Sequence, residues 1–306
     1  MPKTIKRIVL TACLCGLLFL LGAAGCVAPQ SFTFYVTADN RNFTPPEHPG
    51  SAYFTGVCEA IRDLGSGAFI ISPGDIDPPD RTYATIQQVL GQSYTWYPVV
   101  GNHEFGKPEY MEWLRNYNVG GCRLPNIVRG GPPGAVESCY SFNYGNAYFV
   151  VLNLYYDGER DNAGTPMVND ALYQWLADGL AANRKPIIFV AGHEPAVPLW
   201  DMDTGRWRHV GSSLDRDPAT DYRFWSLLGK HHVTAYLCGH THNSSVAKIN
   251  GVWQLDAGHA RGLGDTGAPS TFLQIRVTGE QVDCDVFRSA DAGKQPYRNA
   301  YSERLR

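Results

Sequence analysis

Short apolar runs alternate with amphipathic stretches along most of the chain. The apolar runs are bounded by Gly, Pro, Asp or Asn, which is typical of strands. The stretches between them repeat apolar residues at helical spacing and carry polar residues on the other side. Strands are predicted at residues 31–39, 68–75, 95–102, 185–193 and 233–240, and helices at 50–65, 81–91, 108–117 and 169–184.

Three further segments read as β-hairpins, because each has paired apolar runs around a short turn signal. Residues 139–153 turn at Gly145-Asn146, residues 247–258 at Asn250-Gly251, and residues 270–287 at Thr278-Gly279. Strands that alternate with helices and end in hairpins predict an α/β (α+β) fold. The fold is expected to be a mixed sheet, or two packed sheets, with helices outside.

The chain divides into a leader, one domain and a tail. We expect a signal peptide over residues 1–25, a single domain over residues 26–290 and a polar C-terminal tail over residues 291–306. Residues 195–220 lack a periodic pattern, and a loop of that length is often functional, here as a lid.

The leader has the features of an export signal. Lys3, Lys6 and Arg7 precede an apolar run over residues 8–24, and the ending LGAAGC resembles a bacterial lipobox with Cys26 as the lipidated residue. We expect an exported lipoprotein, anchored to a membrane through Cys26 in the periplasm or at the cell surface. Ordinary secretory cleavage and an uncleaved anchor are the alternatives.

The composition indicates a protein with a large core and gives no sign of a nucleic-acid partner. The chain of 306 residues is 44% hydrophobic, enough for a large core, and its net charge of -3 makes nucleic acid an unexpected partner. Export permits disulfides, and Cys122 with Cys139 is the expected pair because the two flank one loop. The alternative is that the cysteines of the domain are free and mostly buried.

Polar residues of one kind stand where the predicted strands end. Carboxylate, amide and imidazole groups in such positions suit a divalent ion, and two ions that share a carboxylate can clamp a phosphate. Open α/β sheets place their sites where loops leave the carboxyl ends of strands. The residues are Asp39, Asp75, Asn102, His103, His193, His240 and His242.

The motifs GD at 74–75, GNHE at 101–104, GH at 192–193 and GHTH at 239–242 resemble those of the calcineurin-like metallophosphoesterases. The resemblance covers residues 32–288 and implies a β-sandwich flanked by helices. It also implies two metal ions, of Fe, Mn or Zn, with the possibility of a single ion.

The ligand set is carried over from the family motifs. Asp75 is expected to bridge both metals, and Asn102, His193 and His240 to complete one site. Asp39 and His242 are expected to serve the other.

Two neighbours in GNHE take different expected roles. His103 is the expected general acid for the leaving oxygen. Glu104 is expected to orient other groups rather than to bind metal.

One position departs from the family pattern. The first motif is usually Asp-x-His, whereas here Arg41 follows Asp39 and Asn40, and a protonated guanidinium cannot ligate a metal. Water or another side chain could fill the gap, Arg41 could bind the substrate phosphate, or that site could bind metal weakly. Asp77 is a spare carboxylate nearby.

Two residues after a late strand are weaker candidates. His259 and Arg261 could reach the site from its rim, with His259 as a substrate contact; the alternative is a polar loop.

These features predict metal-dependent hydrolysis of a phosphate mono- or diester. The substrate is a phosphorylated small molecule or another phosphoester. The alternative is a degenerate member that binds a phosphorylated ligand without turnover, which the missing histidine would explain.

Overall fold

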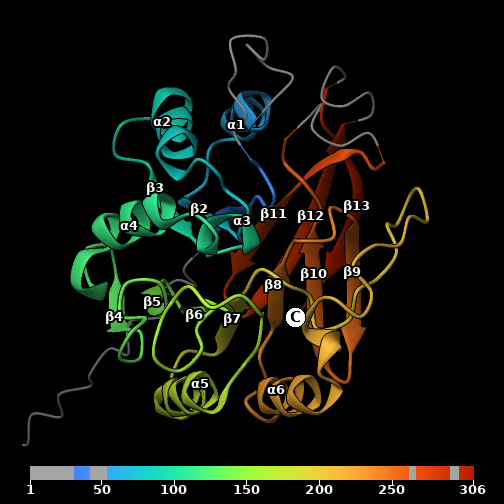
Figure 1. Ribbon diagram of the computed structural model, residues 1–306. Coiled ribbons are helices and arrows are strands. Elements are labelled where there is room, and N and C mark those ends of the chain that lie inside the picture. Colours follow the sequence, from blue (N-terminus) through green and yellow to red (C-terminus); the bar gives the residue numbers. More distant parts are fainter. Residues whose placement is uncertain (1–30, 42–53, 262–266, 290–295) are drawn as a thin grey trace, which may run out of the picture.

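The computed structural model describes residues 31–41, 54–261, 267–289 and 296–306. The leader and Cys26 lie outside the described residues. Two β-sheets pack face to face, with helices on both outer sides (Figure 1). The predicted fold class is therefore confirmed in its two-sheet form.

The first sheet has six strands in the order β13-β12-β11-β1-β2-β3. Strands β1, β2 and β3 are parallel, and β11, β12 and β13 continue the sheet in antiparallel fashion. The bounds are β1 Ser31–Val36, β2 Phe69–Ser72, β3 Thr95–Pro98, β11 Ser270–Thr278, β12 Gln281–Ser289 and β13 Arg298–Arg304.

The second sheet has seven strands in the order β4-β5-β6-β7-β8-β10-β9. Strands β6, β7, β8 and β10 are parallel, and the three strands at its two edges are antiparallel to their neighbours. The bounds are β4 Ile127–Gly130, β5 Tyr140–Tyr144, β6 Ala147–Val151, β7 Ile187–Ala191, β8 Ala235–Cys238, β9 Ser244–Ile249 and β10 Val252–Ala257. The three predicted hairpins are confirmed as β5–β6, β9–β10 and β11–β12.

Helices cover the two outer faces. Helices α1, α2 and α4 pack on the six-stranded sheet, and α5 and α6 pack on the seven-stranded sheet at the opposite side of the molecule (Figure 1). The α-helices are α1 Phe54–Asp63, α2 Pro79–Leu90, α3 Asn102–Phe105, α4 Pro108–Tyr117, α5 Asp170–Ala182 and α6 Pro218–Lys230.

Three apolar layers hold these elements together. The central layer lies between the sheets and includes Phe34, Phe69 and Phe149, whose rings lie within aromatic contact of one another. Each of the other two lies between a sheet and its helices. Because all three layers are buried, the strands are fixed in register and their ends are held in place.

Helix α6 and strand β13 are among the elements that differ from the sequence prediction. Helix α6 lies partly in the stretch without a recognised pattern; Asp217 caps it by accepting from the N–H of Thr220, and Phe224 and Leu228 are buried. Residues 298–304, expected in the polar tail, form β13 instead. Its polar, mostly exposed side chains are those of an edge strand that pairs with β12 on one side only.

The predicted disulfide is absent. Cys122 is exposed, whereas Cys139 is buried and its Sγ accepts from the N–H of Asn153 at 3.2 Å. Both thiols are free, as are those of the other cysteines in the described part of the chain, and all of these except Cys122 are buried. The alternative of free, mostly buried cysteines therefore holds.

Candidate metal centre

The predicted ligands converge where the carboxyl ends of parallel strands from both sheets meet. Asp39, Asp75 and Asn102 follow β1, β2 and β3 of the six-stranded sheet, and His193 and His240 follow β7 and β8 of the other. Residues from the two sheets are in direct contact: Asn102 Oδ1 lies 3.1 Å from His193 Nε2 and 3.0 Å from His240 Nδ1. The central part of the predicted site is thus assembled as expected.

The hydrogen bonding of His193 leaves a lone pair directed at this point. Nδ1 lies 2.7 Å from the carbonyl oxygen of Pro73, so Nδ1 carries the hydrogen and donates it. In the neutral ring, Nε2 then presents a lone pair to Asp75 Oδ1 at 3.2 Å and to Asn102 Oδ1. Three electron-rich atoms face one another, which is the arrangement that a cation completes.

The charge of the surroundings agrees with a cation site. Burial acts to lower the pKa of His193, but the charge and hydrogen bonding of Asp75, together with the charge of Asp39 and the carbonyl of Pro73, raise this pKa to about 10. Burial acts to raise the pKa of Asp75, but His193 and His103 together lower it below its usual value. A proton on His193 therefore satisfies this cluster when no metal ion is bound, and the two compete for the same position.

The backbone is strained at the ligands. Asp39, Asp75, His240 and His242 all have positive φ, between 50° and 68°. Strain of this kind in non-glycine residues persists where the surroundings hold it, and it is common at functional sites. The adjoining glycines give the necessary room: a Cβ on Gly239 would lie 2.5 Å from Asp39 Oδ2, so GH is required at 239–240.

Glu104 holds the loops that carry Asp75 and Asn102. It is fully buried, and its carboxylate accepts from the N–H groups of Gly101 at 2.8 Å, Ile76 at 2.9 Å and Asp75 at 3.0 Å. It is bound to backbone on both oxygens and connects the GD loop to the GNHE turn. These contacts agree with the expectation that Glu104 orients other groups.

At the position expected for a second ion, two arginine side chains lie beside the predicted ligand His242. Asp39 Oδ2 accepts from the N–H of His240 at 2.8 Å, and Asp39 Oδ1 lies 3.3 Å from His242 Nε2. The other nitrogen of His242, Nδ1, lies 2.7 Å from Arg208 Nη1 and 3.0 Å from Arg261 Nη2. Asp39 and His242 are therefore brought together as predicted, but two guanidinium groups bind the far edge of the imidazole.

His103 lies at the open side of the site. Its side chain is 34% exposed, with Nε2 3.5 Å from Asp75 Oδ2 and Nδ1 3.7 Å from Asp77 Oδ2. Asp77 in turn receives Arg41, whose Nε donates at 2.9 Å and Nη2 at 3.4 Å. The guanidinium of Arg41 thus takes part in a fork with Asp77 beside His103.

His259 does not lie on a rim. It is fully buried, Nε2 donates to the carbonyl of Ala268 at 3.0 Å, and its ring centre is 5.9 Å from that of His242. Arg261, considered with it, does reach the site through His242.

Two residues near the centre were not predicted. Glu194 is buried, lies 4.0 Å from His240 Nδ1 through Oε1, and accepts from the hydroxyl of Tyr155. His209, in the loop over residues 195–220, has its ring centre 4.2 Å from that of His240. Glu194 could have been found from the sequence, because it directly follows the predicted ligand His193. His209 could not, because it lies in a loop without hydrophobic periodicity.

The residues gathered at the strand ends fit a metal ion. His193, Glu194 and His240 have ligand atoms within 4.8 Å of one another, as do Asp39, Asp75 and His193. Glu194 Oε2 and Asp39 Oδ1 are buried without a hydrogen-bond partner among the described residues. Buried carboxylate oxygens of this kind need a cation or a donor, so the donor set is that of a divalent-metal centre.

Comparison with known proteins supports the resemblance of the sequence motifs to the calcineurin-like phosphoesterases. A family described as calcineurin-like phosphoesterase matches residues 32–244, which is more than half of the chain. The chain belongs to the calcineurin-like phosphoesterase family. Family membership supports metal-dependent hydrolysis of phosphoesters as the class of reaction.

Solved structures support the fold of this calcineurin-like phosphoesterase. GAP50, described as the anchor in the inner membrane complex of Plasmodium, is 14% identical with a TM-score of 0.57, over 90% of this chain and 88% of that chain. PhoD is 15% identical with a TM-score of 0.58, over 90% of this chain and 69% of that chain. Among curated proteins, none matches the sequence.

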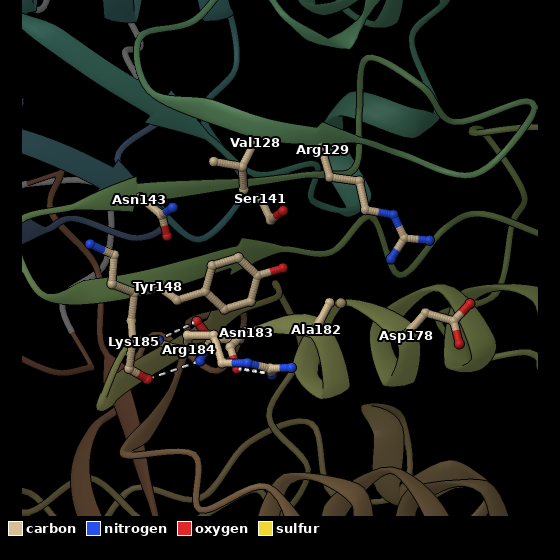
Figure 2. A pocket seen from close by; sticks show the side chains of 11 residues that line it. Val128, Arg129, Ser141, Asn143, Tyr148, Asp178, Ala182, Asn183, Arg184 and Lys185 are labelled. Atoms are coloured by element: carbon tan, nitrogen blue, oxygen red, sulfur yellow. Dashed lines mark hydrogen bonds between the residues drawn. The ribbon is translucent and has the colours of Figure 1, made fainter.

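A separate groove of about 540 Å³ lies between β4–β6 and the C-terminal part of α5. Figure 2 shows Tyr148 in its middle, with Ser141 and Arg129 on one side and Lys185 on another. Lys185 precedes β7, whereas His193 follows it, so the groove lies toward the opposite end of that strand. It is therefore distinct from the metal centre of the phosphoesterase.

Proposed function

We propose that the protein is a metal-dependent phosphoesterase that hydrolyses a phosphate mono- or diester at the strand-end site. The observation that carries the proposal is the convergence of His193 Nε2, Asp75 Oδ1 and His240 Nδ1 around the amide oxygen of Asn102. A metal ion bound among them would explain why two sheets direct four ligand-type side chains to one point.

The same four residues would hold the ion. A divalent ion bound there supplies positive charge to the phosphoryl oxygens and lowers the pKa of a water molecule. Donors of mixed nitrogen and oxygen type suit Fe, Mn or Zn. Glu104 keeps Asp75 and Asn102 in place by its three backbone contacts, and Pro73 keeps His193 in the ligating tautomer.

His103 is placed to handle the proton of the leaving group. It is the partly exposed member of the cluster, and Asp75 and Asp77 face its two nitrogens. The ring therefore stands at the open side of the site, where it can donate a hydrogen to the leaving oxygen. Arg41 fixes Asp77 by a fork of two contacts, so we propose that Arg41 acts by positioning the pair Asp77–His103.

The test is hydrolysis of p-nitrophenyl phosphate and of bis(p-nitrophenyl) phosphate by protein stripped of metal and reloaded with Mn²⁺, Zn²⁺ or Fe²⁺. We expect turnover of at least one ester only in reloaded protein, and a loss of about 100-fold or more in Asn102→Ala. Asn116→Ala, at an exposed position of α4, is the matched control and should retain the parent rate.

Metal binding without turnover of either ester, or turnover that survives Asn102→Ala, would count against the proposal. The first result would favour a degenerate member that binds a phosphorylated ligand. This second candidate function, binding without turnover, is favoured by one observation: Arg41 stands where the family motif usually has a metal-binding histidine.

We also propose that the chain is exported and anchored through lipidated Cys26. Its support is the leader sequence alone, because residues 1–30 lie outside the described part of the chain. No helix among the described residues is long and apolar enough to cross a bilayer. Labelled palmitate should be incorporated by the parent chain and not by Cys26→Ala; equal labelling of the two would contradict the anchor.

A further inference from the structure

The groove between β4–β6 and the end of α5 carries an excess of positive charge. Its charged side chains are three cations and one carboxylate, namely Arg129, Arg184, Lys185 and Asp178. In the part of the chain that the structure describes, the three cations donate to backbone carbonyls and form no ion pair. The groove therefore holds two positive charges in excess, which favours an anionic ligand.

Two of the cations are held in place at the walls of the groove. Arg129 Nη1 donates to the carbonyl of Trp175 at 2.8 Å, and its guanidinium lies over the Trp175 ring, 5.1 Å from the ring centre. Lys185 Nζ donates to the carbonyl of Gly145 at 2.8 Å. Both side chains are half-buried, and each has further N–H hydrogens that can serve an oxyanion. Because the backbone already positions them, little side-chain freedom is lost when a ligand binds.

The floor of the groove contains a buried hydroxyl without a partner. Ser141 is fully buried, and its Oγ meets no hydrogen-bond partner among the described residues. It lies on the face of the β5–β6 hairpin that is turned toward α5, and so does Tyr148 (Figure 2). Buried polar groups in native proteins are normally paired. A ligand with an accepting oxygen would complete the floor of this groove.

Tyr148 stands in the middle of the groove as a second hydroxyl. Burial raises the pKa of Tyr148, and an interaction with the neighbouring Ser141 and the charge of Arg129 oppose this effect. The two hydroxyls are thus neighbours, although they do not meet in the geometry of a full hydrogen bond. Because its pKa is raised, the phenol keeps its hydrogen at neutral pH and can donate it to a ligand.

Gly179 makes room for these donors against helix α5. Glycine inside a helix is less favourable than alanine. Here a Cβ would lie 2.9 Å from the hydroxyl oxygen of Tyr148 and 3.4 Å from Arg129 Nη1. The glycine therefore lets a hydroxyl and a guanidinium lie close together, beside an apolar edge formed by Val128 and Ala182.

We propose that this groove is a second ligand site, which binds a small organic phosphate monoester through Arg129, Lys185 and the hydroxyls of Tyr148 and Ser141. A phosphate monoester has a charge of about −1.5 to −2 at pH 7 and three accepting oxygens, so it matches the excess charge and the donors. The organic part would contact the apolar edge. The volume of about 540 Å³ suits a small molecule.

The test is calorimetric titration of the Mn²⁺-loaded protein with phenylphosphonate at pH 8, since its P–C bond resists hydrolysis. We expect a dissociation constant of about 1 mM or tighter. The same binding should persist in Asn102→Ala, which removes a ligand of the metal centre. Arg129→Met/Lys185→Met should weaken it by about tenfold or more and leave hydrolysis of p-nitrophenyl esters at the parent rate. Arg62→Met/Lys230→Met, with the same change of charge at exposed positions, is the control and should bind as the parent does.

Two further variants keep the test independent of folding. Lys185→Met alone leaves the contact of Arg129 with Trp175 intact and should still weaken binding several-fold. Ser141→Ala should weaken binding by about 3–10-fold without lowering the urea midpoint, because its hydroxyl has no partner in the free protein. A lower midpoint in Ser141→Ala would mean that the hydroxyl supports the fold, and would count against the site.

The outcomes separate this site from the metal centre. Binding that is lost in Asn102→Ala but kept in Arg129→Met/Lys185→Met would place the probe at the metal centre and overturn the inference. Equal affinity for inorganic phosphate would overturn the organic class of ligand, and equal affinity for benzoate would overturn the preference for a dianion. Groove binding in a parent that hydrolyses neither ester would uphold this inference while the proposed function fails.

Discussion

Replacement of Glu104 by Gln tests how the ligand loops are held. The carboxylate accepts three backbone N–H groups, two on Oε2 and one on Oε1. An amide has one accepting oxygen, so its best orientation keeps the contacts with Asp75 and Gly101 and turns its NH₂ group toward the N–H of Ile76. One hydrogen bond to a charged acceptor is lost and one buried donor is left unpaired.

The size of the effect follows from these contacts. A lost hydrogen bond to a charged group and a stranded buried donor each cost about 1–3 kcal/mol, so Glu104→Gln should lower the free energy of unfolding by about 2–6 kcal/mol. An opposing effect exists: burial and the charges of Asp75 and Asp77 raise the pKa of Glu104. Three N–H donors favour the carboxylate over the acid, so we expect the loss to dominate.

The assay is urea unfolding of the metal-free protein at pH 7, with Mn²⁺ affinity measured by calorimetry. We expect the stated loss of stability and at least about tenfold weaker Mn²⁺ binding, because Asp75 is no longer held. Glu109→Gln, at an exposed position of α4, is the control and should change neither quantity. Unchanged stability and affinity in Glu104→Gln would refute the reasoning, since it would mean that Glu104 is neutral and its contacts are weak.

Three other predictions follow from separate features. His103→Ala should lower kcat by about 10²–10⁴-fold with unchanged metal content, and a retained rate would exclude His103 as the proton donor. Hydrogen bonds from Arg288, against the effect of burial, lower the pKa of Asp201 to about 2. Because the folded-state pKa is lowered, the resulting stability of about 2 kcal/mol is present above the unfolded-state pKa, near pH 4, and is lost as the pH falls toward 2. In urea unfolding, Asp201→Asn should therefore differ from the parent by less at pH 2.5 than at pH 7, and a constant difference would contradict the pairing. Asn169 caps α5 by accepting from the N–H of Leu172 at 2.9 Å, so Asn169→Ala should cost about 1 kcal/mol by the same method, and no loss would exclude the cap.

Much of the centre could be predicted because its residues stand at strand ends. Parallel strands bring their carboxyl ends to one edge, so apolar runs that end in Asp75, Asn102 and His193 indicated both the sheets and the site. The glycines beside them fit the same pattern, since the backbone at the ligands leaves no room for a Cβ.

The loop that closes the site could not be predicted in the same way. Arg208 and His209 lie in a segment with no period, and its course is set by distant contacts such as that of Asp201 with Arg288, 87 residues away. The fork of Arg41 with Asp77 and the burial of His259 likewise depend on packing between segments. Strand β13 was missed because an edge strand with polar side chains has the composition of a tail.

The most direct test of the central claim is anomalous diffraction from crystals of the protein soaked in Mn²⁺. The account predicts a peak within bonding distance of His193 Nε2, Asn102 Oδ1, Asp75 and His240 Nδ1, at the meeting point of the two sheets. No peak there at saturating Mn²⁺, or a peak only at residues outside this cluster, would contradict it.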